Sequence, residues 1–266
     1  MRGPKALFET EDQWVTRMGA WFSGERVVFR GQDLHADLKD MNWMELYVYG
    51  ITGRRFEADQ LKVLNAIWTS TSYPDPRLWN NRVTALAGTA RSTPTLALSG
   101  AMAISEATIY GHRANVHAID FIIRTKKAVE KGIKLEELVK KELKDRRTIG
   151  GYGRPLHRSD ERIPHMMKLL REVGMDQGSH VQLAMQIEKQ LMLGRLRMRM
   201  NISGLDAALG ADLGFSVREY HLFVTPAFLA GMPPCFLDTY ERAEAAFFPM
   251  RCSRIQYEGV SRREWK

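Results

Sequence analysis

The side chains best suited to chemistry in this sequence lie in three short segments. The first, Tyr110–His117, reads YGHRANVH and places His112 and Arg113 where a turn enters an expected helix, with His117 one turn later. The free N–H groups of a helix start, beside a cation, favour an anion. The other interpretation is a polar helix cap with a histidine satisfied in the core, and the residue types alone favour it.

The second segment, Gly151–Arg162, reads GYGRPLHRSDER and gathers positive charge beside glycines that free the backbone. The planar guanidinium of arginine presents a fork of donors that matches a carboxylate or a phosphate. A site for an anionic substrate and an ordinary charged surface loop explain this composition equally well. The basic residues concerned are Arg154, His157, Arg158 and Arg162.

The third segment, Arg199–Asp206, reads RMNISGLD and follows a long apolar stretch. The amide of Asn201 and the hydroxyl of Ser203 could donate hydrogen bonds to an oxyanion. Taken alone, the segment is more typical of a helix end and a turn. No His or Cys cluster has the spacing of a zinc site, and neither GxSxG nor the P-loop signature occurs, so we expect no metal site.

The composition is that of a folded globular protein. Of the 266 residues, 44% are hydrophobic and 26% charged, which excludes a disordered or fibrous chain. Lys and Arg total 39 against 31 Asp and Glu, and the resulting formal charge of +8 favours anionic partners. No run of five or more like charges occurs, so a nucleic-acid-binding arm is not expected.

The sequence also predicts a compartment. Cys235 and Cys252 are the only cysteines, too few for a disulfide framework, which favours reducing conditions. No stretch reaches the ~18 apolar residues of a membrane span, and the N-terminus has no apolar signal-peptide core. We therefore expect a cytoplasmic protein that does not enter a membrane.

The elements that must position these groups are mostly helices, so the predicted fold class is all-α. Residues 25–30 (ERVVFR) form the one expected strand. The uncharged stretch Ser92–Ser105, rich in Ala, Ser and Gly, predicts a close-packed buried helix. Apolar spacing predicts further helices over 42–50, 58–70, 83–90, 114–127, 135–143, 163–173 and 181–200.

Taken in order, five segments resemble the citrate synthase superfamily, most closely its short citryl-CoA-lyase-like members. The resemblance runs from residue 25 to about residue 263. Each segment is weak alone, and their common order and spacing make the assignment specific. The segments are RVVFRGQDL from Arg26, GHRANVHAI from Gly111, GYGRP from Gly151, NISGLDAALGADLGF from Asn201 and RIQYEG from Arg254.

The resemblance implies an almost entirely helical fold, with a large and a small domain and an active-site cleft between them that a homodimer partner completes. The large domain would comprise residues 1–117 and 216–266, and the small domain residues 118–215. It also implies acyltransferase or lyase chemistry on an acyl-CoA and an oxo acid. Coenzyme A would enter as the thioester of the substrate, so no further cofactor is required.

The chain departs from the family at each catalytic position that the resemblance implies. The family uses a carboxylate to take a proton from the acyl-CoA methyl group, and two histidines to stabilise the enol and polarise the keto acid. Here those histidines fall on Gly111 and Arg154, and the aspartate falls on Ser203. Serine is no comparable base, and arginine stays charged near pH 7. Citrate synthesis by the usual residues is therefore not expected.

One function that accounts for the replacements is a citrate-synthase-like enzyme with altered chemistry. It would make or break a C–C bond next to a thioester or carboxylate of an anionic substrate. His112 would be a relocated acid or base, Asn201 and Ser203 would donate to an oxyanion, and Arg154 would polarise a carbonyl or hold a carboxylate. The expected substrate-binding residues are Arg113, His157, Arg158, Arg162 and Arg254, of which Arg158 and Arg162 match basic positions of the family.

The alternative is a non-catalytic homologue that binds an acyl-CoA or an organic acid, or partners an active subunit. Loss of all three catalytic side chains motivates it, and such a protein would tolerate alanine at His112 and Arg154. We favour the enzyme. A nucleic-acid-binding protein rests only on the positive charge, because the segment around His112 lacks the context of a recognition helix.

Overall fold

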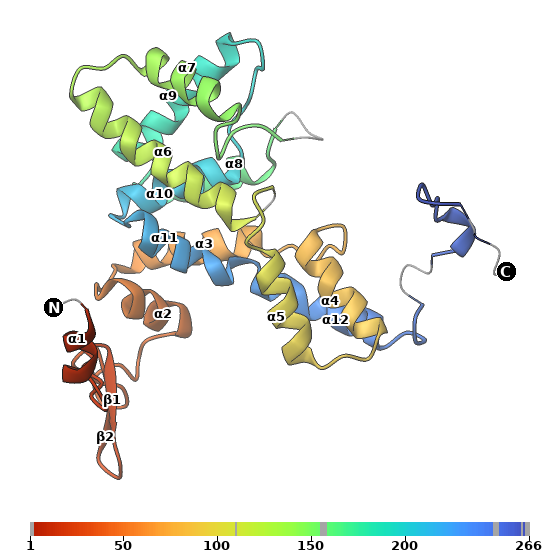
Figure 1. Cartoon of the computed structure of the whole chain (residues 1–266). Coiled ribbons are helices and arrows are strands. Elements are labelled where there is room, and N and C mark those ends of the chain that lie inside the picture. Colours follow the sequence, from red (N-terminus) through yellow and green to blue (C-terminus); the bar gives the residue numbers. More distant parts are fainter. Residues whose placement is uncertain (1–2, 110, 155–158, 247–249, 262, 264–266) are drawn as a thin grey trace. The chain divides into compact units, whose positions relative to one another are not determined.

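The structure, a computed structural model, describes residues 3–109, 111–154, 159–246, 250–261 and 263. Most of these residues are helical, which confirms the predicted all-α class (Figure 1). In chain order the elements are α1 (Pro4–Glu9), β1 (Gly19–Phe22), β2 (Arg26–Phe29), β3 (Gln32–Asp33), α2 (Trp43–Thr52), α3 (Ala58–Thr71), α4 (Trp79–Thr89), α5 (Pro94–Ile104), α6 (His112–Glu130), α7 (Leu135–Arg146), α8 (Arg162–Glu172), α9 (Ser179–Leu193), α10 (Ile202–Asp212), α11 (Val217–Val224), η1 (Thr225–Gly231), α12 (Met232–Tyr240) and η2 (Cys252–Arg254).

The chain separates into two compact units. The first comprises Met1–Ile67 and Ala114–Val224, and the second comprises Trp68–Arg113 and Thr225–Lys266. These bounds are not those of the large and small domains expected from the sequence. The expected large and small domains were defined as the two sides of an active-site cleft. That division of the chain stays a prediction.

The expected strand, β2, is the middle strand of a small antiparallel sheet in the first unit. It pairs with β1, where Gly19 lies opposite Phe29, and with β3, where Val28 lies opposite Asp33. The sequence analysis missed β1 and β3 because strands of four and two residues carry almost no alternating pattern.

Helix α2 shows how the sequence sets the ends of an element. Asn42 Oδ1 accepts a hydrogen bond from the Glu45 N–H at 2.9 Å, so its side chain caps the first turn. Gly53 ends the helix at φ 70°, a left-handed conformation that glycine adopts at little cost. Both ends agree with the prediction.

The core of the first unit surrounds α10, most of whose residues are buried. Its apolar residues lie all round the helix, as expected for a helix enclosed by others. The ring of Tyr220 from α11 packs directly against Gly210, where a Cβ atom would lie 2.6 Å from that ring. Ile119 of α6 and Ile187 of α9 are fully buried in the same core.

In the second unit α4 packs closely on both α5 and α12 (Figure 1). Gly88 of α4 lies against the backbone of α12, so that a Cβ there would meet the carbonyl oxygen of Phe236. Thr239 Oγ1 donates a hydrogen bond to Ala85 O at 2.7 Å across the same contact. The missing side chain at Gly88 therefore sets the distance between the two helices.

Two expectations about individual helices are wrong. Helix α5 is not buried: Ala97 and Ala101 are, but Leu96 keeps 67% of its surface exposed, because within the described chain only one face of α5 packs on other helices. Helix α9 ends at Leu193 rather than near residue 200, because Gly194 turns to an extended conformation with ψ 172°.

Among the described residues, one helical run, Val217–Tyr240, is long and apolar enough to cross a membrane by length and composition. The expectation that no stretch qualifies is therefore wrong. Arg218, Glu219 and Asp238 only flank this run, because residues 220–237 contain no Asp, Glu, Lys or Arg. The mean hydropathy of its best window is 1.2 and 44% of that window is buried, and core helices of soluble proteins pass the same test.

Candidate functional site

Two of the three predicted segments meet in the first unit, where the loop 150–154 lies against the start of α10. Tyr152 and Met200 form an antiparallel β-bridge. Beside it, the Asn201 N–H donates to Gly151 O at 2.9 Å. These backbone contacts, which we call the loop joint, hold the arginine-bearing loop against the segment that carries the expected oxyanion donors.

The glycines at the loop joint allow the loop to pack closely against α10 and α6. Gly151 has φ +85°, and a Cβ atom there would lie 2.5 Å from Gly204 Cα. Gly150 lies against α6 in the same way, since its Cβ would be 2.7 Å from Ala114 O and 2.8 Å from Ala118 N. Close contact with other backbone therefore explains Gly150, Gly151 and Gly204 without a phosphate, whereas Gly153 has φ +85° and only the Met198 side chain within 4 Å.

Asn201 faces the loop that it holds. Its Nδ2 donates to Gly153 O at 2.9 Å, whereas Oδ1 is buried and has no hydrogen-bond partner among the described residues. Ser203 lies in the first turn of α10 and is partly exposed. One of the two amide hydrogens of Asn201 is thus used by the fold, and the Ser203 hydroxyl remains as a candidate oxyanion donor.

Asp160 ties the loop to the N-terminus of α10. Its Oδ2 accepts the Ile202 N–H at 2.9 Å, and Arg162 donates to both carboxylate oxygens at 2.8 and 2.7 Å. Burial alone would raise the pKa of Asp160, but the hydrogen bonds from Arg162 and the Ile202 N–H outweigh it and hold the pKa below its ordinary value. Arg162, expected to bind substrate, is already the partner of this carboxylate.

Arg154 is paired within its own loop. Both terminal nitrogens contact the carboxylate of Glu161, with Nη2 3.1 Å from Oε1. An anionic substrate would have to replace Glu161, whose side chain is 58% exposed. His157 and Arg158, also expected to bind substrate, lie outside the described residues.

His112 belongs to the second unit and is completely buried. Its ring stacks on Phe228 with centroids 4.8 Å apart, and Nδ1 lies 3.5 Å from Glu106 Oε1. This environment agrees with the interpretation as a core histidine. The acid–base role of His112 stays a prediction, as do the roles of Arg113 and Arg254, both of which are exposed.

Gly111, where the family's first histidine falls, leaves no room for a side chain. A Cβ atom there would lie 2.6 Å from Ser105 O and 2.8 Å from Ala107 N. Such distances to backbone atoms cannot be relieved by a side-chain rotation. The backbone of this turn therefore accommodates only glycine at residue 111.

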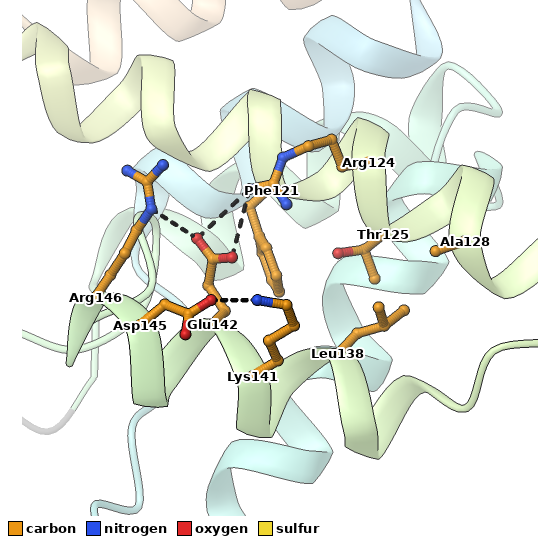
Figure 2. A pocket seen from close by; sticks show the side chains of 9 residues that line it. All are labelled: Phe121, Arg124, Thr125, Ala128, Leu138, Lys141, Glu142, Asp145 and Arg146. Carbon is orange, nitrogen blue, oxygen red and sulfur yellow. Dashed lines mark hydrogen bonds and ion pairs between the residues drawn. The ribbon is translucent and has the colours of Figure 1, made fainter.

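The sequence analysis missed a polar cluster between α6 and α7, in which Glu142 lies between two arginines (Figure 2). His117 Nε2 lies 2.8 Å from Glu142 Oε1, and the Glu142 side chain is only 9% exposed. Arg124 Nη2 is 3.4 Å from Oε2 and Arg146 Nε is 3.3 Å from Oε1. A signal was present, because Glu142 follows Leu135 by seven residues and so occupies a position on the apolar stripe of α7.

A cavity of about 370 Å³ opens beside this cluster, between α6 and α7 (Figure 2). Its charged side chains already pair with one another, Arg124 and Arg146 with Glu142, and Lys141 with Asp145. An incoming charged ligand would have to break these pairs, so we assign no ligand to the cavity. Its lining is completed by Phe121, Thr125, Ala128 and Leu138.

Asp206 is a second buried carboxylate, and its Oδ1 has no hydrogen-bond partner in the described part of the chain. Burial raises the pKa of Asp206 well above its ordinary value, with Arg162 opposing the shift and Asp160 adding to it. The buried Tyr220 hydroxyl also lacks a hydrogen-bond partner there, and burial followed by the charge of Asp206 raises its pKa. Among the described residues, no hydrogen bond to Oδ1 stabilises the charge of Asp206, whereas hydrogen bonds from Arg162 and the Ile202 N–H stabilise that of Asp160.

No family model and no curated protein matches this sequence. Among solved structures, citryl-CoA lyase from Hydrogenobacter thermophilus matches with a TM-score of 0.82 at 17% identity, over 95% of this chain and 97% of that chain. ATP citrate lyase from Methanothrix soehngenii, in complex with citrate and coenzyme A, matches at 0.77 and 16% identity, over 98% of this chain and 45% of that one. Citrate synthase from Thermotoga maritima matches at 0.63 and 16% identity, over 86% and 60%.

This chain thus spans less than half of the ATP citrate lyase chain and nearly the full length of citryl-CoA lyase. No group of three or more His, Cys, Asp or Glu residues in the described part of the chain could hold a metal ion. At these identities the likeness establishes the fold and leaves the activity to the site itself. The helical fold of this chain is the one found in citryl-CoA lyase and in citrate synthase.

Proposed function

We propose that this protein is an enzyme that makes or breaks a C–C bond next to a thioester or a carboxylate of an anionic substrate. The observation that carries the proposal is the match to citryl-CoA lyase, which includes nearly all of both chains. The ATP citrate lyase structure, which contains citrate and coenzyme A, supports an acyl-CoA or a di- or tricarboxylate as the substrate class. A coenzyme A thioester would be the substrate, with no further cofactor.

The loop joint would supply the binding groups. Arg154 would exchange Glu161 for a substrate carboxylate, and the exchange replaces one carboxylate by another because the Glu161 side chain is 58% exposed and can move into solvent. The Ser203 hydroxyl would donate to the oxyanion that develops, where the N-terminus of α10 adds positive potential. Arg162, held by Asp160, would add its charge from a fixed position.

We also propose that two copies of the chain associate. The second unit leaves a group of large apolar side chains exposed on α4, α5 and α12, which marks an interface rather than a solvated surface. Leu96→Glu on this surface should convert a dimer into a monomer in light scattering, and a dimer that persists would contradict this interface. The exposed residues are Leu86, Leu96, Ile104, Leu237 and Tyr240.

The test of the chemistry is deuterium exchange at the α-carbon of acetyl-CoA in heavy water, with and without oxaloacetate. Enzyme-dependent exchange is expected, because either direction of the reaction passes through a carbanion or enol at this carbon. Cleavage of citryl-CoA, followed by release of acetyl-CoA, measures the reverse direction. Absence of both reactions, with coenzyme A binding confirmed by calorimetry, would contradict the enzyme.

A non-catalytic homologue that binds an acyl-CoA or an organic acid is the second candidate. The crowded backbone at Gly111 favours it, because the family's histidine cannot be placed there without moving the turn. It predicts binding of coenzyme A thioesters without exchange. Alanine at Arg154 would leave the affinity of such a protein unchanged.

A further inference from the structure

We propose that His117, positioned by the buried carboxylate of Glu142, is the group that accepts a proton from the substrate in this protein. The inference rests on the proposed C–C chemistry. It assigns the role of general base, which the hydroxyl of Ser203 cannot fill. His117 would be a catalytic residue, in contact with the substrate, and Glu142 a positioning residue that acts through the imidazole.

Glu142 determines which ring nitrogen of His117 carries the hydrogen. Arg124 and Arg146 both contact its carboxylate, at 3.4 and 3.3 Å, so its oxygens lie among hydrogen-bond donors. A charged carboxylate only accepts hydrogen bonds, so His117 Nε2, 2.8 Å from Oε1, is the protonated nitrogen and the donor. Nδ1 then holds the lone pair, as in a general base oriented by a carboxylate.

The second ring nitrogen of His117 is available to a substrate. Nδ1 has no hydrogen-bond partner among the residues that the structure describes, and it is not among the buried unsatisfied atoms. The side chain as a whole is 16% exposed. Nε2 of the ring is thus held by Glu142, and Nδ1 is available to a ligand.

The backbone of His117 lies beside the loop joint. Gly150 packs so closely on this turn of α6 that a Cβ atom there would lie 3.2 Å from the carbonyl carbon of His117. The same loop continues to Arg154 and is bonded to Asn201. The proposed base therefore lies on the helix that supports the proposed anion-binding loop.

His112 and His180 also lie beside carboxylates, and each lacks one of these features. His112 is completely buried and stacks on Phe228. His180 Nδ1 lies 2.8 Å from Asp212, but that carboxylate also accepts the backbone N–H groups of His180 and Val181, so it serves as the cap of α9. His180 therefore provides a matched control: a partly buried, carboxylate-paired histidine with a structural role.

The proton transfer balances without a co-reactant. The C–H bond next to the thioester carbonyl breaks, its electron pair moves into the enolate, and the proton passes to His117 Nδ1. The resulting imidazolium carries a hydrogen on both nitrogens, and the negative charge of Glu142 stabilises it. In heavy water the ring exchanges this proton with solvent before returning a deuteron to the carbon.

The test compares α-carbon exchange of acetyl-CoA in the wild type and three variants, with circular dichroism to confirm folding. His117→Gln should lower the exchange rate by ~10²–10⁴-fold, the usual effect of losing a general base. His180→Gln should leave it unchanged. Glu142→Gln should lower the rate and shift its pH profile, because the amide no longer requires a hydrogen on Nε2, and Glu142→Asp should restore part of the rate.

A measurement on the wild type keeps the test decisive if His117→Gln does not fold. Nitrogen-15 NMR should show hydrogen on Nε2 of His117 and the lone pair on Nδ1. The charged groups of this cluster are Glu142 and Arg146 on α7 and Arg124 on α6. Hydrogen on Nδ1 would overturn the assignment.

The outcomes separate the two proposals. Exchange in the wild type that survives in folded His117→Gln rejects His117 as the base and keeps the C–C chemistry. No exchange and no citryl-CoA cleavage in the wild type rejects the C–C chemistry and the base with it. Loss of exchange in both His117→Gln and His180→Gln, with folding intact, would show a structural effect and reject the specific role of His117.

Discussion

Gly151 and Gly204 are in backbone contact: a Cβ atom on Gly151 would lie 2.5 Å from Gly204 Cα, and a Cβ atom on Gly204 would lie 2.5 Å from Gly151 O. The contact joins the arginine-bearing loop to the first turn of α10. Any side chain at either position must push the two segments apart. The geometry of the candidate site therefore depends on two residues that have no side chain.

Gly204→Ala should destabilise the protein by about 1–3 kcal/mol, because the added methyl group meets backbone that cannot rotate away. Urea unfolding followed by circular dichroism measures the change. The matched control is Gly194→Ala, where the nearest atom would be at an ordinary 3.4 Å, and its effect should stay within about 0.5 kcal/mol. Equal effects at both positions would contradict the packing argument.

Asp206→Asn should stabilise the protein at alkaline pH. The pKa of Asp206 is raised in the folded state, so wild-type stability falls as pH rises from the unfolded value, about 4, through the folded value. Asparagine removes this loss, on the order of 1–3 kcal/mol at pH 8, and should match the wild type near pH 4. Unfolding curves at several pH values measure it, and parallel pH dependences of the two proteins would refute the assignment.

Asp160→Asn should have the opposite sign. The pKa of Asp160 is lowered in the folded state, so its contribution is present above the unfolded value, about 4, and is lost as pH falls through the folded value. The variant should be less stable than the wild type by about 1–3 kcal/mol at pH 7, with a smaller difference at pH 3. Asp145→Asn, which removes an exposed partner of Lys141, is the control and should change little.

Arg154→Met should abolish turnover, leave the protein folded and lower the thermal midpoint slightly, because the Arg154 side chain is 24% exposed and also lies 4.0 Å from the buried carboxylate of Asp160. Glu161→Gln should retain activity, since it frees the arginine for substrate. Steady-state kinetics and thermal unfolding of both variants provide the comparison. Full activity in Arg154→Met would remove this residue from the binding machinery.

Much of the fold could be predicted from the sequence, because helix periodicity and helix capping depend on residues that are close together in the chain. Asn42 and Gly53 mark the ends of α2 through local hydrogen bonding and backbone conformation, so both could be predicted. The exposure of α5 could not, because a run of small residues does not reveal how many neighbours it has. Burial is a property of the partners of a helix as much as of its own sequence.

Only part of the candidate site could be predicted, because the partners of its residues are also set by the tertiary fold. The order of the motifs placed Arg154, Asn201 and Ser203 in segments that do meet, but the partners of Arg154 and Arg162 come from carboxylates whose position only the folded loop defines. His117 and Glu142 lie on different helices, so their pairing leaves no spacing pattern. The carboxylate on the apolar stripe of α7 was the one local sign of it.

The tight turn around Gly111 also limits which residues can supply a side chain at this helix start. Backbone atoms of Ser105 and Ala107 occupy the space that the first atom of any side chain would need. Gly111→His would therefore displace the turn and, with it, the buried ring of His112, the next residue. Any reactive group at the start of α6 must come from a position other than residue 111.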